Sequence, residues 1–263
     1  MEIIDLSWGQ LALSFIMLLP PAYILWHYDT GLNRKLLTAT LRMVLQLVFV
    51  GFYLEYLFEL DNPWVNSAWI LVMVGVADFA TIDRSDLKRK KSLLIPIFGA
   101  TFLGIGIVDL FFLEVVIQLP KFLAAQYTIP ITGMVLGNCL RSNVIGFNAF
   151  FYSLRDHRER YQFFLGCGAT RTEALKPFIS QALQRSANPT LAAMATIGLV
   201  SLPGMMTGQI LSGSSPMIAI KYQILIMVAI FSGTILSVYL GILFSTRFVF
   251  KETDMLDESV LKE

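Results

Sequence analysis

An arginine lies inside a long apolar stretch of this chain. Arg141 is the charged residue of segment 127–153, and Asn138, Ser142 and Asn143 lie close to it in the sequence. A charge within such a segment is costly, so it faces a cavity or a partner. One interpretation places Arg141 in a translocation path, as a counter-charge, a gate or an anion-binding group. The other pairs it with a carboxylate that locks helices together.

Two short segments repeat one pattern of glycines and an amide. Segments 133–138 and 204–209 both read G-x-x-x-G followed by a side-chain amide. Glycines four residues apart form a groove in which helix backbones approach closely. We expect ordinary helix packing, against one another or against a second copy, at Gly133, Gly137, Gly204 and Gly208. The alternative is a polar path lined by Asn138, Arg141, Ser142, Asn143, Met205, Met206 and Gln209.

Soft and acidic side chains are candidate ligands for a passing metal ion. Met205 and Met206 carry soft thioethers, although methionine also serves as a core filler. Asp109 and Glu114 are weaker candidates, because they lie toward a helix end where water reaches them. The two histidines fall outside the apolar runs. We therefore expect a weak, transient metal site and not a tight one.

Several catalytic patterns are absent from the sequence. It contains no G-x-x-x-x-G-K-[ST], so the polypeptide has no Walker A loop for ATP. It contains no G-x-S-x-G, H-E-x-x-H or C-x-x-C, so hydrolase, metalloprotease and cysteine metal sites are unsupported. Its short basic clusters lack interleaved aromatic residues, which disfavours nucleic-acid binding. We expect a protein that is not an enzyme and binds no cofactor of its own.

The elements that position these residues are long apolar helices. The chain has 263 residues, of which 56% are hydrophobic, against about 45–50% in soluble domains. A spanning helix needs about 20 mostly apolar residues. The pattern predicts an all-α polytopic membrane protein with about seven transmembrane helices, at 6–26, 36–58, 64–82, 92–112, 127–153, 190–211 and 218–246.

Basic residues predict the orientation. They gather in segments 27–35, 83–91 and 154–189 and in the tail, whereas the connections between them carry few. The positive-inside rule then places the N-terminus outside and the C-terminus in the cytoplasm. We expect one transmembrane domain over 1–250, followed by a cytosolic tail over 251–263. The acidic tail should be a solvated or disordered end.

The segment 155–189 is polar, basic and regularly patterned. Thr170 and Glu173 fit a capping box, and the apolar residues after them fall on one helix face. Asn188-Pro189 should end that helix. We expect it to lie along the inner membrane face, after a glycine-hinged turn over 165–170. An interfacial helix with a solvated charge cluster is the simpler interpretation, and a docking surface is the other.

The order of these elements resembles the coupling element of ABC-transporter permeases, an E-A-A followed after three residues by G-A-S. Residues 162–164 stand at the first place and 168–170 at the second. Gln162 replaces the usual glutamate, so docking should rest on the shape of the turn and on nearby basic residues. The resemblance implies coupling to an ATPase through Gln162, Leu165, Gly166, Gly168, Ala169, Thr170 and Arg171.

The segments 198–216 and 137–143 resemble sequences of one permease family. The resemblance extends over the whole chain. That family contains bacterial iron-export permeases and plant aluminium-resistance half-transporters. The resemblance implies an exporter permease in the bacterial inner membrane, paired as a homodimer in the lipid bilayer. A separate cytosolic ABC ATPase would hold ATP and Mg, and iron or another metal would be the cargo. The alternatives are a gradient-driven transporter or channel without an ATPase, and an assembly or receptor scaffold.

Overall fold

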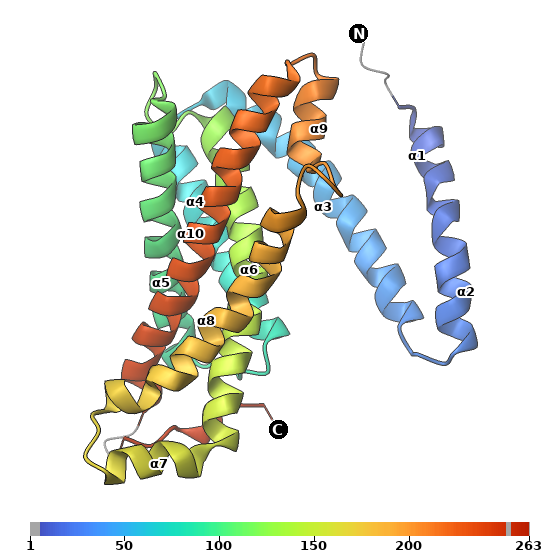
Figure 1. Ribbon diagram of the computed structural model, residues 1–263. Helices are drawn as coiled ribbons and strands as arrows, with labels where there is room; N and C mark the ends of the chain where they lie inside the picture. The colour runs from blue at the N-terminus through green and yellow to red at the C-terminus, as the bar shows by residue number, and fades with distance from the viewer. Residues whose placement is uncertain (1–5, 251–253, 263) are drawn as a thin grey trace. The chain divides into compact units, whose positions relative to one another are not determined.

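The computed structural model describes residues 6–250 and 254–262, and these residues form an all-helical fold (Figure 1). Five described helices are long and apolar enough to cross a membrane. They are Trp8–His27, Asn33–Leu60, Pro63–Arg84, Lys91–Ile117 and Pro216–Val249. The all-α prediction is confirmed, while the predicted count of seven spans and the orientation stay predictions.

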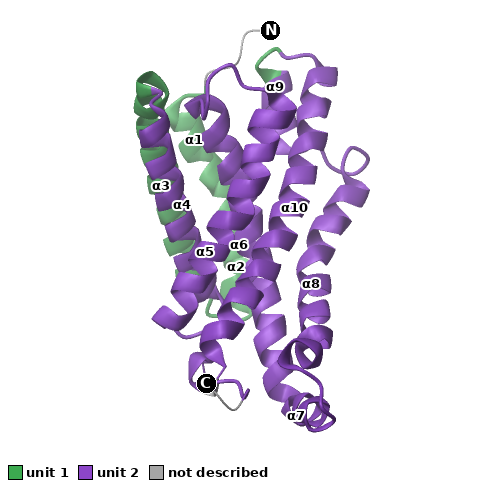
Figure 2. Ribbon diagram, turned by 90° about the vertical axis from the view of Figure 1, so that its left-hand side faces the viewer, with its two compact units in different colours: residues 1–60, 211–213 green, residues 61–210, 214–263 purple. Residues whose placement is uncertain are grey.

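The chain divides into two compact units (Figure 2). The first unit comprises the chain up to Leu60 together with Leu211–Gly213, and the second comprises the rest. In the first unit, α1 (Trp8–Ser14), a 3-10 turn (Phe15–Leu18) and α2 (Leu19–His27) follow one another, and α3 (Asn33–Leu60) comes next. Leu57 is the buried residue of these elements. Their exposed apolar side chains suit contact with lipid.

The second unit is built around α10 (Pro216–Val249), which packs against α5 (Lys91–Leu110), α6 (Ala125–Asp156) and α8 (Arg171–Thr196). α4 (Pro63–Arg84) packs against α5 and α6. A π-helical turn (Phe111–Ile117) extends α5. Two of these helices start in the same way, because Asn62 and Ser215 cap α4 and α10 ahead of a proline in the first turn.

Small residues let α10 approach its neighbours. Five buried positions of α10 are spaced four residues apart: Ala229, Gly233, Ser237, Gly241 and Ser245. A Cβ at Gly241 would lie 2.5 Å from Phe147 Cζ, and one at Gly233 would lie 2.9 Å from Val135 Cγ1. Both neighbours belong to α6. The small-xxx-small spacing therefore produces the close contact between α6 and α10.

The helix predicted after the glycine turn forms the first half of α8, and its place along the membrane face stays a prediction. Its predicted apolar stripe is correct, because Ala174, Leu175, Phe178 and Ala182 are buried in the core of the second unit. The expected break at Asn188-Pro189 is wrong, since α8 continues to Thr196. A proline inside a helix removes one backbone hydrogen bond, and packing against α6 and α10 outweighs that loss.

The segment 190–211 is therefore not one continuous helix. α8 ends at Thr196, residues 197–203 form a turn, and α9 begins after them (Gly204–Leu211). Gly198 has a φ of +83° in this turn, a conformation that favours glycine. The prediction of a single apolar span fails here because mean hydropathy does not register a local backbone break.

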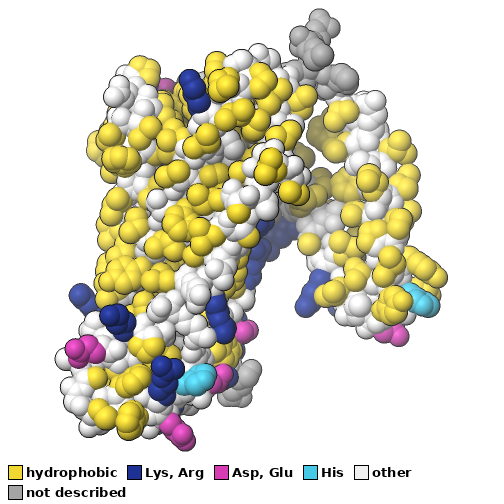
Figure 3. All heavy atoms as spheres, viewed as in Figure 1, with side chains coloured by type: hydrophobic (Ala, Val, Ile, Leu, Met, Phe, Trp, Pro, Cys, Tyr) yellow, Lys and Arg dark blue, Asp and Glu magenta, His cyan; other side chains and the backbone are white. Residues whose placement is uncertain are grey.

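Charged side chains gather at one end of the second unit. In Figure 3 they lie around the short helix α7 (Arg158–Gly166) and the start of α8, and hydrophobic side chains cover the faces above them. The described tail residues also belong to this end (Figure 1). Val260 and Leu261 are buried against the core, so the expected solvated or disordered tail is wrong at these two residues. Apolar residues within the acidic tail are the reason.

Candidate functional site

A cavity of about 450 Å³ lies among α6, α8, α9 and α10 of the second unit. From α6 it is lined by Met134, Asn138, Arg141, Ser142 and Ile145, whose spacing puts them on one helix face. The polar lining as a whole is Asn138, Arg141, Ser142, Thr190, Ser201 and Gln223. Most of the remaining lining is apolar. The cavity therefore combines one charge with several neutral hydrogen-bonding groups.

Arg141 lies near the middle of α6, which has 32 residues. This midpoint is about 24 Å from either end of the helix. The ion pairs formed among the described residues do not include Arg141. The second interpretation, in which Arg141 pairs with a carboxylate, thus finds no partner within the described part of one copy. Arg141 is an exposed residue of the cavity lining.

The structure brings together only some of the predicted path residues. Asn138, Arg141, Ser142 and Met205 line the cavity, and the first donates its amide to the backbone oxygen of Met134 at 2.8 Å. Met206 and Gln209 belong to the same short helix α9 as Met205 but are not part of the lining.

Asn143 lies outside the cavity, in a buried hydrogen-bond network. Its Nδ2 donates to Ser237 Oγ at 2.8 Å, and the Ser237 hydroxyl is 3.4 Å from Thr101 Oγ1. Thr101 donates to Asp78 Oδ1 at 2.9 Å. The four residues come from α6, α10, α5 and α4, so this network joins helices inside the core. Its position supports a structural role for Asn143.

Gln223 was not predicted, yet it lines the cavity from α10. Its side chain is 8% exposed, and its Oε1 has no hydrogen-bond partner among the described residues. A buried amide oxygen without a partner is unusual in a folded protein. The available sequence signal was an amide inside an otherwise apolar span, which by itself marks a functional candidate.

The predicted packing glycines lie in different surroundings. A Cβ at Gly133 would lie 3.3 Å from Met73 Cε of α4, whereas one at Gly137, Gly204 or Gly208 would meet no described atom within 4 Å. The two G-x-x-x-G segments therefore show no tight mutual contact at these glycines. Packing against a second copy stays a prediction.

The acidic metal candidates are separated from the cavity. Asp109 is buried and accepts a hydrogen bond from Thr132 at 2.6 Å. Glu114 lies in the π-helical turn after α5. The described residues contain no group of three or more His, Cys, Asp or Glu side chains able to hold a metal ion. Of the four metal candidates, Met205 alone reaches the cavity.

The predicted glycine-hinged turn connects α7 to α8. Gly168 has a φ of +90°, and its N–H donates to the backbone oxygen of Leu165 at 2.9 Å, which closes the end of α7. The capping box is present, since Glu173 accepts from the Thr170 N–H at 2.8 Å. These hydrogen bonds hold the carboxylate in its charged form and lower the pKa of Glu173.

The tail packs directly beside this turn. Arg171 forms an ion pair with Asp254, and the Tyr161 hydroxyl donates to the backbone oxygen of Asp254 at 2.9 Å. Gln162 lies 3.6 Å from the Met255 sulfur. Burial, together with the nearby Asp254 carboxylate, raises the pKa of Tyr161. Two of the predicted coupling residues, Gln162 and Arg171, thus bind the chain's own tail.

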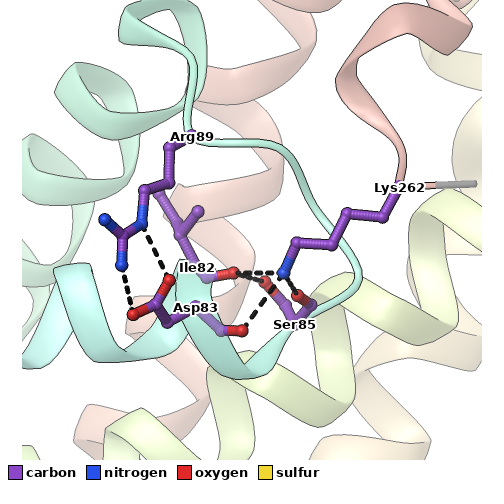
Figure 4. Close-up of polar contacts among 5 residues, drawn as sticks. All are labelled: Ile82, Asp83, Ser85, Arg89 and Lys262. Atoms are coloured by element: carbon purple, nitrogen blue, oxygen red, sulfur yellow. Dashed lines mark hydrogen bonds and ion pairs between the residues drawn. The ribbon is translucent and has the colours of Figure 1, made fainter.

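The end of the tail also binds the connection between α4 and α5. Figure 4 shows the Lys262 ammonium facing backbone carbonyls at the end of α4, with Nζ 3.1 Å from Asp83 O and 2.7 Å from Ser85 O. Arg89 pairs with Asp83 beside them. A cation suits the negative end of a helix dipole. The tail therefore ties the α4–α5 connection to the α7–α8 turn.

These features define a class, a multi-pass helical membrane protein. The model of the uncharacterised protein family UPF0014 matches residues 8–250. The chain belongs to this family.

Named relatives support the same class. The chain is 33% identical over 218 residues to the UPF0014 membrane protein YjkA of Bacillus subtilis (82% of this chain, 85% of the relative). It is 30% identical over 257 residues to the probable iron export permease protein FetB of Escherichia coli (97% and 96%). It is 29% identical over 218 residues to Protein ALUMINUM SENSITIVE 3 of Arabidopsis thaliana (82% and 77%). These relatives confirm the family resemblance. No solved structure matches.

Proposed function

We propose that this chain is the membrane permease subunit of an ATP-driven ABC exporter in the bacterial inner membrane. Two copies would form a homodimer and bind a separate cytosolic ATPase, which holds ATP and Mg. Iron or another metal is the proposed cargo, by likeness to the relative named as a probable iron export permease. The cytosolic side would be the end that carries α7 and the tail, in accord with the positive-inside rule.

The observation that carries this proposal is the continuity of α8. Thr170 caps the helix at the docking turn, while Thr190 and Ala193 line the cavity near its other end. The 26 residues of α8 form a rod about 39 Å long. A push on the turn would therefore move one wall of the cavity, as an alternating-access mechanism requires.

The docking turn is tested by co-purification with a candidate ATPase encoded beside the gene. Gly168→Trp places a bulky side chain on the turn at a φ of +90°, so we expect loss of bound ATPase. Gly198→Trp is the matched control, because Gly198 has a φ of +83° just beyond the other end of α8. It should retain the ATPase. Undiminished ATPase binding by Gly168→Trp would refute the docking site.

A second test separates the ATPase-driven function from gradient-driven transport. We expect the purified chain alone in liposomes to move no metal ion, and the chain with its ATPase to do so only with ATP. Arg141→Ala should abolish transport and leave ATPase binding intact, since Arg141 lies on the cavity wall. Transport by the chain alone would instead favour a gradient-driven transporter or channel.

A further inference from the structure

The charges around the cavity do not suit a bare metal cation. Arg141 is its one charged lining residue in the described chain, and no Asp, Glu, His or Cys lines it there. Iron ions in proteins are bound chiefly by imidazole, carboxylate and thiolate groups. A guanidinium instead binds carboxylates through paired hydrogen bonds. An anion is therefore the ligand that this wall favours.

The start of α9 adds a second group that favours an anion. Pro203, Gly204 and Met205 line the cavity where α9 begins. The first N–H groups of a helix have no acceptor within the helix, and the dipole makes that end positive. A Cβ built at Gly204 meets nothing within 4 Å, so a ligand can approach the backbone there.

Gln223 supplies an acceptor that carboxylate binding alone would not use. Gln223 lines the cavity, and its Oε1 is buried without a hydrogen-bond partner among the described residues. A buried acceptor gains most from a ligand that brings a donor. Arg141 and the α9 N–H groups are donors only. The three groups together fit a ligand that carries both carboxylates and a hydroxyl.

We propose that this cavity binds a small hydroxycarboxylate anion, either free or as its iron chelate. Carboxylate oxygens would lie against Arg141 and the start of α9, and the hydroxyl would donate to Gln223. The volume of about 450 Å³ lies within the range of small-molecule sites, about 300–1,000 Å³. This assignment rests on the proposed function, in that the ligand would be the form in which metal is exported.

The test is direct binding to the purified full-length chain in lipid nanodiscs, measured by titration calorimetry. The probes are citrate, iron(III) citrate, ferrous ion and tricarballylate, which has the carboxylates of citrate and no hydroxyl. We expect one or both citrate forms to bind more tightly than tricarballylate, and ferrous ion alone not to bind at the cavity. If citrate binds more tightly than iron(III) citrate, the ligand is the free anion. If iron(III) citrate binds more tightly, the ligand is the iron chelate.

Matched variants locate the binding. Arg141→Gln should weaken citrate binding at least about tenfold, because a hydrogen-bonded charge is lost, and Arg141→Lys should be intermediate. Arg247→Gln removes a charge from α10 outside the cavity and should bind normally. Gln223→Leu should weaken citrate binding and leave tricarballylate binding unchanged. Equal effects of Arg141→Gln and Arg247→Gln, or no citrate binding by the parent chain, would overturn the proposal.

Failure of this inference is distinguishable from failure of the proposed function. The titration needs no ATPase, so citrate binding with no co-purifying ATPase would keep the site and reject the ABC assignment. The opposite result is tight binding of ferrous ion that does not depend on Arg141, together with transport that depends on the ATPase. It would keep the exporter and reject the anion.

Discussion

At the charged end of the second unit, a single carboxylate stabilises the start of α8 through hydrogen bonds that require its negative charge. The Glu173 carboxylate accepts from the backbone and the hydroxyl of Thr170 at 2.8 and 2.7 Å. Both donors belong to the residue that caps α8. Since α8 reaches from the docking turn to the cavity, the cap stabilises the helix proposed to transmit movement.

The capping box predicts a pH dependence of stability. The folded-state pKa of Glu173 is lowered from 4.5, so its stabilisation is present above that value and is lost as the pH falls through the lowered pKa. We expect Glu173→Gln to lower the melting temperature in detergent at about pH 7, with the difference shrinking at about pH 3. An unchanged difference at the acidic pH would show that the carboxylate's charge is not responsible.

At the scale of helices, close packing is concentrated where α10 meets α6. The G-x-x-x-G pattern predicts this role for Gly137, but a Cβ at Gly137 would meet open space. The tight positions are Gly146, Gly233 and Gly241, where a Cβ would fall within 3 Å of a side chain of the facing helix. Burial of both helix faces distinguishes these glycines, and spacing alone does not reveal burial.

A methyl group added at Gly241 should therefore destabilise the protein. Gly241→Ala would place its Cβ 2.5 Å from Phe147 Cζ, and overpacking of a core costs about 1–3 kcal/mol. Gly137→Ala is the control on α6, because the added methyl meets open space and helix propensity favours alanine by about 0.5–1 kcal/mol. Thermal unfolding in the same detergent measures both. A more stable Gly241→Ala variant would contradict this account of the packing.

At the scale of the second unit, the tail fastens the charged end together. Lys262 binds carbonyls at the end of α4, and Asp254 pairs with Arg171 at the start of α8. The tail also covers part of the proposed docking surface. A soluble partner would therefore meet a surface made of α7, the α7–α8 turn and the tail.

Removing the Lys262 ammonium should loosen the α4–α5 connection. We expect Lys262→Met to be cut by trypsin after Arg89 severalfold faster than the parent chain, because the carbonyls of Asp83 and Ser85 lose their donor. Lys176→Met removes an exposed lysine of α8 and serves as the control. Equal cleavage rates in all three proteins would mean that the tail contact does not hold this connection in solution.

The amino-acid sequence alone determined the helical class, the family resemblance, the capping box at Thr170 and the glycine turn at Gly168, because hydropathy and local backbone chemistry act over a few residues. Only the tertiary structure decided that α8 passes through Pro189 and that Asn143 belongs to the core network. It also placed Gln223 and Arg141 in the lining of one cavity and the tail beside the α7–α8 turn. These outcomes depend on which helix faces meet, and contacts between distant segments leave no periodic signal in the chain.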